Sequence, residues 1–155
     1  MTTSIAHTGT VVRGLFEAPA QEDDEFGIYV HIPFCSHICP YCDFNTYAGQ
    51  SARIPAYVEA VVREIAQWGN QFSTRSAASI FIGGGTPSLL DPVQIGVILA
   101  ACNSHFELSA TAEITVEANP NNLDERSCCG LLDAGVNRLS IGAQTLDRRG
   151  LRVLG

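Results

Sequence analysis

Three cysteines, Cys35, Cys39 and Cys42, stand in a C-x3-C-x2-C pattern, and this spacing constrains the chain more than any other feature. They follow directly on a β-branched and aromatic run, 28–32, which predicts a buried strand with the cysteines on the loop after it. Cubane iron-sulfur clusters and structural zinc sites normally take four protein ligands. Three converging thiolates without a fourth nearby therefore predict a metal group with one open position.

A zinc site is the main alternative at this loop. Phe44, two residues after Cys42, cannot coordinate a metal, so His31 and His37 would have to complete a zinc site. Cys102 is the next cysteine and lies far along the chain, so the paired C-x2-C knuckles of a zinc ribbon are absent. Inert core packing gives no reason for the spacing of the three cysteines.

Composition excludes several function classes. A chain of 155 residues with 46% hydrophobic content predicts one domain with a real core. Its formal net charge of -7 argues against nucleic acid or anionic lipid as partners. It has no lysine, which excludes Schiff-base chemistry and a P-loop lysine. Six cysteines without a signal peptide indicate reduced thiols in a cytoplasmic protein, and no apolar run approaches membrane-spanning length.

The chain reads as a flexible leader over residues 1–25 followed by one folded region, 26–155. In that region strand, loop and helix alternate four times, which predicts right-handed βαβ units and a parallel sheet. The pattern does not distinguish a barrel from a doubly wound open sheet. Strands are expected over 28–32, 77–82, 112–117 and 137–142, and helices over 54–68, 92–102, 124–133 and 147–154.

Some details of the helices can be predicted as well. The first helix has Pro55 in its first turn, and Gly69 is expected to end it. Trp68 on its apolar face is expected in the core. The adjacent Cys128 and Cys129 are also expected to pack there, because no third ligand accompanies them.

Unusual residues follow the carboxyl end of every predicted strand. The three cysteines follow the first strand, the glycines 83–85 the second, Glu117 ends the third, and Gln144 follows the fourth. In parallel α/β folds this end of the sheet carries the active site. We therefore expect these residues to form one site.

Each of these residues also has an ordinary structural interpretation. The glycine triplet allows close approach of a ligand to the backbone, but it is equally suited to a tight turn. Glu117 would be a partly buried carboxylate bound to ribose hydroxyls or an ammonium group, or paired with Arg138. Gln144 suits a ribose or an amide. Tyr29 and Tyr41 flank the cysteine loop and could stack, donate a hydrogen bond or simply pack.

Four motifs occur in order: YVHIPFC-x3-C-PYC, GGGTP, VEANP and RLSIGAQ. Together they resemble the radical S-adenosylmethionine (SAM) superfamily, in its branch of oxygen-independent coproporphyrinogen III oxidases and heme chaperones of the HemW type. The resemblance runs from about Gly27 to the last residue. It implies a partial TIM-type (β/α)6 barrel, of which about four βα units are present. The chain would then be the N-terminal part of the core domain, without the C-terminal domain.

The resemblance also implies cofactors. A [4Fe-4S] cluster would bind Cys35, Cys39 and Cys42, with SAM on the open iron. The residues that would contact or lie near SAM are Gly84, Gly85 and Thr86 at its methionine moiety, Glu117 and Gln144 at its ribose or nearby polar groups, and Tyr29 and Tyr41 beside the cluster and SAM.

Phe44 bears on the choice within the branch. The oxidising members carry a fourth cysteine as C-x-C, whereas the chaperones carry C-x-F, as here. The resemblance thus favours a heme chaperone that delivers heme to acceptor proteins and has a reductant such as a flavodoxin or ferredoxin. The heme site would lie outside this part of the chain. Oxidase activity is not expected, and coproporphyrinogen III oxidase stays the alternative.

Overall fold

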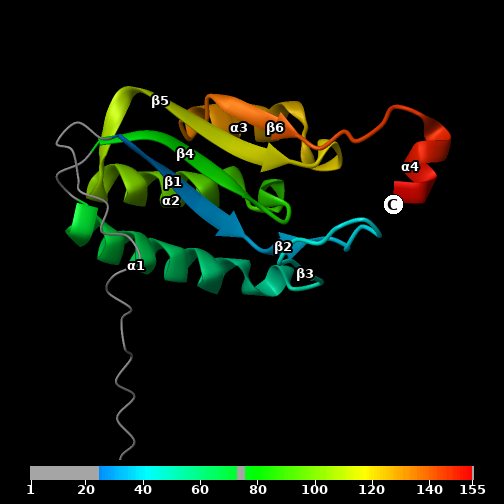
Figure 1. The fold of residues 1–155 in the computed structure, drawn as a ribbon, viewed down its shortest axis with the longest axis horizontal. Coiled ribbons are helices and arrows are strands. Elements are labelled where there is room, and N and C mark those ends of the chain that lie inside the picture. Colours follow the sequence, from blue (N-terminus) through cyan, green and yellow to red (C-terminus); the bar gives the residue numbers. More distant parts are fainter. Residues whose placement is uncertain (1–24, 73–75, 155) are drawn as a thin grey trace, which may run out of the picture.

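The computed structural model describes residues 25–72 and 76–154, and its centre is a parallel four-stranded sheet (Figure 1). The strands are β1 (Phe26–Ile32), β4 (Ser76–Gly84), β5 (Glu107–Ala118) and β6 (Arg138–Ile141). Between them run α1 (Ile54–Phe72), α2 (Pro92–His105) and α3 (Glu125–Asp133), and α4 (Arg148–Leu154) follows β6. A parallel pair, β2 (Phe34–Cys35) and β3 (Tyr47–Ala48), and the 3-10 turns η1 (Ser51–Arg53), η2 (Pro87–Leu89) and η3 (Pro120–Asn122) complete the elements.

The winding of the sheet settles the question that the sequence left open. The strand order β1-β4-β5-β6 is the order of the chain, without the reversal that a doubly wound sheet requires. Because such crossovers are almost always right-handed, α1, α2 and α3 fall on one face of the sheet, as Figure 1 shows. The α/β class and the barrel-type arrangement of about four βα units are confirmed.

The core lies between the sheet and these three helices. Its sheet side consists of alternate apolar residues such as Ile32, Ile82 and Val116, all fully buried. From the helices, Ile95 and Ile98 of α2 and Ile65 of α1 pack against them. The intervening strand residues point to the opposite face, called here the inner face. It carries Tyr29, His31, Phe81, Glu113, Thr115, Glu117, Arg138 and Ser140.

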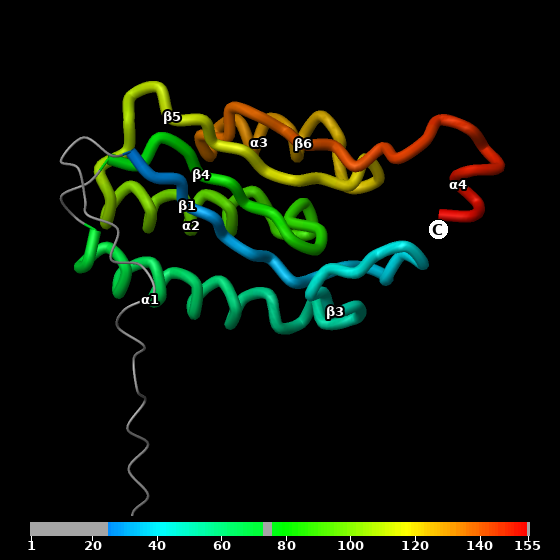
Figure 2. Tube along the Cα trace, in the orientation of Figure 1, coloured from blue at the N-terminus to red at the C-terminus, as the bar shows by residue number. Residues whose placement is uncertain are grey.

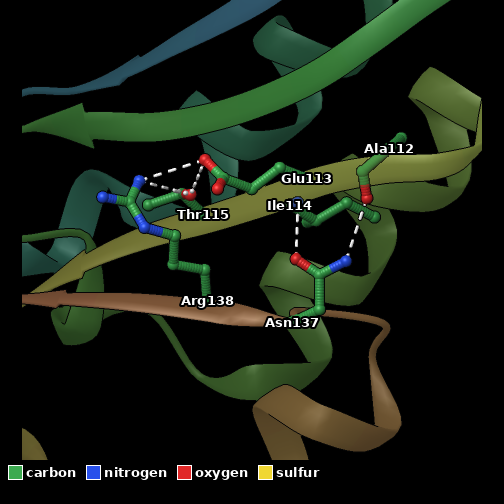
Figure 3. Close-up of polar contacts among 6 residues, drawn as sticks. All are labelled: Ala112, Glu113, Ile114, Thr115, Asn137 and Arg138. Carbon is green, nitrogen blue, oxygen red and sulfur yellow. Dashed lines mark hydrogen bonds and ion pairs between the residues drawn. The ribbon is translucent and has the colours of Figure 1, made fainter.

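Polar contacts on and beside the inner face fix the pairing of β5 with β6 (Figure 3). The Arg138 guanidinium lies 3.0 Å from the Glu113 carboxylate and also donates to the buried Thr115 hydroxyl. At the start of β6, the Asn137 side chain accepts from the Ile114 N–H and donates to the Ala112 carbonyl. Arg138 therefore pairs with Glu113, and the alternative partner expected from the sequence, Glu117, is left for other contacts.

Local signals account for the helix boundaries. Asp91 accepts a hydrogen bond from the Val93 N–H, Gln94 closes a capping box, and Pro92 occupies the first position of α2. Asp124 and Ser127 form a second capping box at α3. Gly135 in the turn after α3 has φ +100°, which favours glycine.

Three sequence predictions about packing were wrong. Gly69 does not end α1, which continues to Phe72. Gly69 is buried against His105 of α2, and a Cβ on Gly69 would lie only 2.6 Å from the His105 Cβ, so this position has room for glycine alone. Trp68 is 48% exposed, with its indole N–H directed at Glu64. Cys129 is exposed and Cys128 only half-buried, since Leu131 is the residue that α3 buries.

The proposed division at residue 25 receives no test, because residues 1–24 lie outside the described part of the chain. Within the described ranges, every helix is too short or too polar to cross a membrane.

Candidate functional site

The cysteine loop leaves the sheet at the carboxyl end of β1. Pro33 leads into β2, which ends on Cys35, and the chain returns at β3, where the Tyr47 N–H donates to the Pro33 carbonyl at 2.7 Å. Between these limbs the Cys42 N–H donates to the Cys39 carbonyl at 3.0 Å. Cys35 is buried, the other two cysteines of the loop are half-buried, and all three are free thiols.

The glycine segment at the end of β4 packs directly on this loop. The Gly85 N–H donates to the Ile32 carbonyl and the Thr86 N–H to the Phe34 carbonyl, each at 2.8 Å. A Cβ on Gly85 would lie 2.7 Å from the Phe34 carbonyl and 3.0 Å from the Cys35 sulfur. Only glycine fits this contact, so the triplet serves the approach to the cysteines as well as the turn.

Glu117 reaches the same segment from β5. Its Oε2 accepts the Gly84 N–H at 3.0 Å, and Gly84 has φ +114°. No second hydrogen bond to this carboxylate is found among the described residues, so an oxygen is left to accept from a ligand. On the adjacent strand, Ser140 lies opposite Glu117 in the register.

The cysteine loop, the glycine segment and the ends of β5 and β6 surround a cavity of about 330 Å³ at one end of the sheet. Figure 2 shows the cysteine loop and the segment between β6 and α4 at this same end of the sheet, with a gap between their backbones. The cavity is lined by every site residue predicted from the sequence except Tyr29: Cys35, Cys39, Tyr41, Cys42, Gly84, Gly85, Thr86, Glu117 and Gln144. The prediction that strand-end motifs come together is therefore met in the geometry.

Tyr29 lies outside this cavity. Its hydroxyl is 3.0 Å from His31 Nδ1, and its ring stacks on Phe81 of the inner face. In this structure it supports the site through His31 and does not line it.

Further lining residues were missed by the sequence analysis. They are Ser36, Ile38, Ala118, Asn119, Ser140, Ile141 and Gly142; His37, which the sequence offered only as a zinc ligand, and Phe44 line the cavity too. Most neighbour a motif residue or end a strand, which is the signal that could have found them. Asn119 also receives structural support, because its N–H donates to the Ser88 hydroxyl at 3.0 Å.

Gln144 adopts φ +47°, a conformation that is uncommon for residues other than glycine. Backbone conformations of this kind cluster at ligand sites. The loop after β6 thus holds an amide side chain in the cavity wall at the cost of some strain.

The metal-binding capacity of the cavity rests on its donor set. Three soft thiols face one space, which fits an iron-sulfur or zinc group. As they stand, however, no three His, Cys, Asp or Glu side chains in the described part are close enough to form a ready metal site. The convergence expected from the sequence is therefore incomplete, and binding would require the loop to bring the sulfurs together.

Two side chains lie close to the thiols, although most of the loop residues 36–48 are exposed. The Thr86 hydroxyl lies 3.5 Å from the Cys35 sulfur, and His37 Nε2 lies 3.7 Å from the Cys39 sulfur. Burial, followed by the hydrogen bond with Cys39 and the negative charge of the two thiolates, raises the pKa of Tyr41. Phe44 is 71% exposed at the mouth of the cavity and offers no donor atom.

Comparison with known proteins decides the family. Residues 29–155 match the radical SAM superfamily over its characteristic domain. The chain belongs to this superfamily. The radical SAM assignment carries with it a [4Fe-4S] cluster and SAM as the cofactors of the family.

Relatives and a solved structure place the chain within the radical SAM proteins. It is 41% identical over 127 residues to the heme chaperone HemW of Lactococcus lactis, covering 82% of this chain and 32% of the relative. It is 37% identical to the mitochondrial radical SAM domain-containing protein 1 of Bos taurus, covering 90% and 31%. A structure of the Escherichia coli coproporphyrinogen III oxidase HemN, a radical SAM enzyme, matches with TM-score 0.80 and 30% identity, covering 86% and 31%. The chain thus spans about a third of the length of these relatives.

Proposed function

We propose that this radical SAM chain is part of a heme chaperone, which holds a [4Fe-4S] cluster and SAM in the strand-end cavity and delivers heme to acceptor proteins. The observation that carries the proposal is Phe44. It lines the cavity at the position where the motif resemblance implies a fourth cysteine in the oxidases, and it has no ligating atom. Relatives named heme chaperone HemW at 41% and 39% identity support the same choice.

Two kinds of side chain in the cavity would bind the two cofactors: thiols the cluster, and polar side chains SAM. Cys35, Cys39 and Cys42 supply three thiolates and leave one iron for SAM. When bound, the cluster can supply one electron to the sulfonium of SAM. The free oxygen of Glu117 accepts from ribose hydroxyls or an amino group, and Gln144 offers both donors and an acceptor.

The backbone of Gly84 and Gly85 lines the cavity and would contact the SAM methionine moiety, while the absent side chains let this segment pack closely on His31 and the cysteine loop. Gly84 and Gly85 have no room for side chains, because a Cβ would come within 2.6 Å of His31 and 2.7 Å of the Phe34 carbonyl. The Thr86 hydroxyl donates to the Cys35 sulfur, so it would lie between the cluster and the methionine moiety of SAM. Heme as cargo, its acceptor proteins and a flavodoxin or ferredoxin reductant complete the proposal, with the heme contacts outside the described residues.

Heme transfer tests the chaperone role. The longest natural protein that contains this chain is reconstituted anaerobically, loaded with heme and mixed with an apo-acceptor such as an apo-cytochrome. We expect a heme absorption band on the protein, followed by its transfer to the acceptor. Failure to retain any heme in the reconstituted protein would reject the chaperone proposal.

Coproporphyrinogen III oxidation is the second candidate, favoured by the fold similarity to HemN. The same reconstituted protein is incubated anaerobically with coproporphyrinogen III, SAM and dithionite, and the porphyrins are separated by chromatography. The substrate should remain unchanged. A protoporphyrinogen product would replace the chaperone proposal with the oxidase.

A further inference from the structure

The imidazole of His31 joins the inner face of the sheet to the returning limb of the cysteine loop. Its Nε2 lies 2.9 Å from the carbonyl oxygen of Asn45. Because a carbonyl oxygen only accepts, Nε2 carries the hydrogen. In the neutral ring Nδ1 is then the acceptor, and the Tyr29 hydroxyl at 3.0 Å donates to it.

Tyr29 is suited to this role of fixing the tautomer. Partial burial and, to a lesser extent, the negative charge of Glu117 raise its pKa, so the hydroxyl keeps its proton. The backbone of His31 is held from the other side of the sheet, since the Tyr57 hydroxyl of α1 donates to its carbonyl at 2.7 Å. The backbone that carries the imidazole ring is therefore held in place by α1.

Among the described residues, the backbone hydrogen bonds that join the loop reached by His31 to other segments lie near the ends of the loop. Its first limb is held by the Thr86 N–H on the Phe34 carbonyl, and its second by the Tyr47 N–H on the Pro33 carbonyl. The cysteines lie between these points. The bond from His31 to Asn45 is the side-chain contact that ties the second limb to the main sheet within the described residues.

The same ring packs against the glycine segment. A Cβ on Gly84 would lie 2.6 Å from both Nδ1 and Cε1 of His31, so the ring and the glycine are in close contact. The N–H of Gly84 is the donor to Glu117. One side chain thus touches both the cysteine loop and the segment proposed to hold SAM, although it does not line the cavity itself.

We propose that His31 is a positioning residue that sets the spacing between the cysteine loop and the glycine segment by holding the Asn45 carbonyl, with Tyr29 fixing its tautomer. The cofactor consequence of this tether rests on the proposed function. The tether itself is a property of the chain alone.

Amide hydrogen exchange in the cofactor-free protein tests the tether directly. In His31→Leu the hydrogen bond is lost, and amides 42–48 should exchange roughly three- to tenfold faster. In His31→Gln the side-chain N–H can still donate to Asn45, so most of the protection should return. Tyr29→Phe, which frees the tautomer, should lie between the two. Amides 77–82 of β4 and 108–115 of β5, away from the His31 ring, serve as the folding control and should keep the parent's rates.

Two results would overturn the tether: unchanged exchange of amides 42–48 in His31→Leu, or an equal loss of protection throughout β4 and β5. The second readout is cofactor binding after reconstitution. SAM should bind about tenfold more weakly to His31→Leu than to His31→Gln if the spacing matters to the cluster and SAM. If the parent itself holds no cluster while the exchange result stands, the proposed function fails and the tether does not.

Discussion

At the residue scale, the identity of single side chains in the cavity decides what it can bind. The sequence predicted that the three cysteines would lie near Glu117 and Gln144, and all five line one cavity. Within the described residues, the sulfurs are not close enough together to form a ready metal site. The hydrogen bond from His31 to Asn45 was not predictable, because it depends on how a loop returns to the sheet and leaves no periodic signal. The position of Tyr29 was not predictable either. Its motif suggested that Tyr29 lies beside the cluster and SAM, whereas its hydroxyl contacts His31.

Substituting one cavity thiol tests the ligand assignment. Cys39→Ala should abolish retention of iron after anaerobic reconstitution, because two thiolates cannot hold a cubane. Cys128→Ala removes a half-buried thiol on α3, outside the cavity, and should keep the parent's iron content. Equal iron in the Cys39 variant and the parent would show that Cys39 is no ligand.

Adding one methyl group tests the contact between the glycine segment and the loop. In Gly85→Ala the new Cβ meets the Phe34 carbonyl and the Cys35 sulfur, so the protein should lose about 1–3 kcal/mol of stability and most of its SAM binding. Gly96→Ala in α2 is the matched control, since its Cβ would meet Ala134 at an ordinary 3.6 Å. That change should stabilise the chain by about 0.5–1 kcal/mol. Urea unfolding of both variants measures the difference, and similar effects at the two positions would contradict the packing described.

At the element scale, the helix starts and the end of α3 were predicted well, whereas α1 and α2 both run past their predicted ends. Asp91 and Asp124 cap their helices through local hydrogen bonds that sequence motifs encode. Gly69 was predicted to end α1, but a glycine is needed there because α1 packs closely against His105 of α2. A contact between two helices leaves no signal in the local sequence. Trp68 was placed in the core by helical periodicity, yet its side chain is 48% exposed, while Ile54, Val58 and Ile65 are the residues that α1 buries in the core.

The cap of α3 makes a pH-dependent contribution to stability. Hydrogen bonds from the Ser127 N–H and hydroxyl lower the pKa of Asp124. A carboxylate with a lowered pKa stabilises the fold above its ordinary pKa of about 4, and this contribution is lost as the pH falls through the folded value. Urea unfolding from about pH 6 to about pH 3 should therefore show a shallower acid loss in Asp124→Asn than in the parent. Ser127→Ala, which removes only part of the bonding, should give an intermediate slope; parallel curves for all three would refute this role of the cap.

At the scale of the whole molecule, the chain order of the four strands puts every strand-end motif around one cavity. Alternation and helix spacing predicted the βαβ repeats, but only the strand order distinguishes barrel-type winding from an open sheet. In the described part, β1 and β6 are the outer strands of the main sheet. The cavity nevertheless contains contributions from each of its four strand ends.

The central claim is that three thiolates leave one iron of a [4Fe-4S] cluster open for SAM. Electron paramagnetic resonance of the anaerobically reconstituted and dithionite-reduced chain, recorded with and without SAM, tests it most directly. The account predicts about four irons per chain and a reduced-cluster signal that changes shape when SAM is added. A colourless protein that binds zinc, or a cluster signal unaltered by SAM, would contradict it.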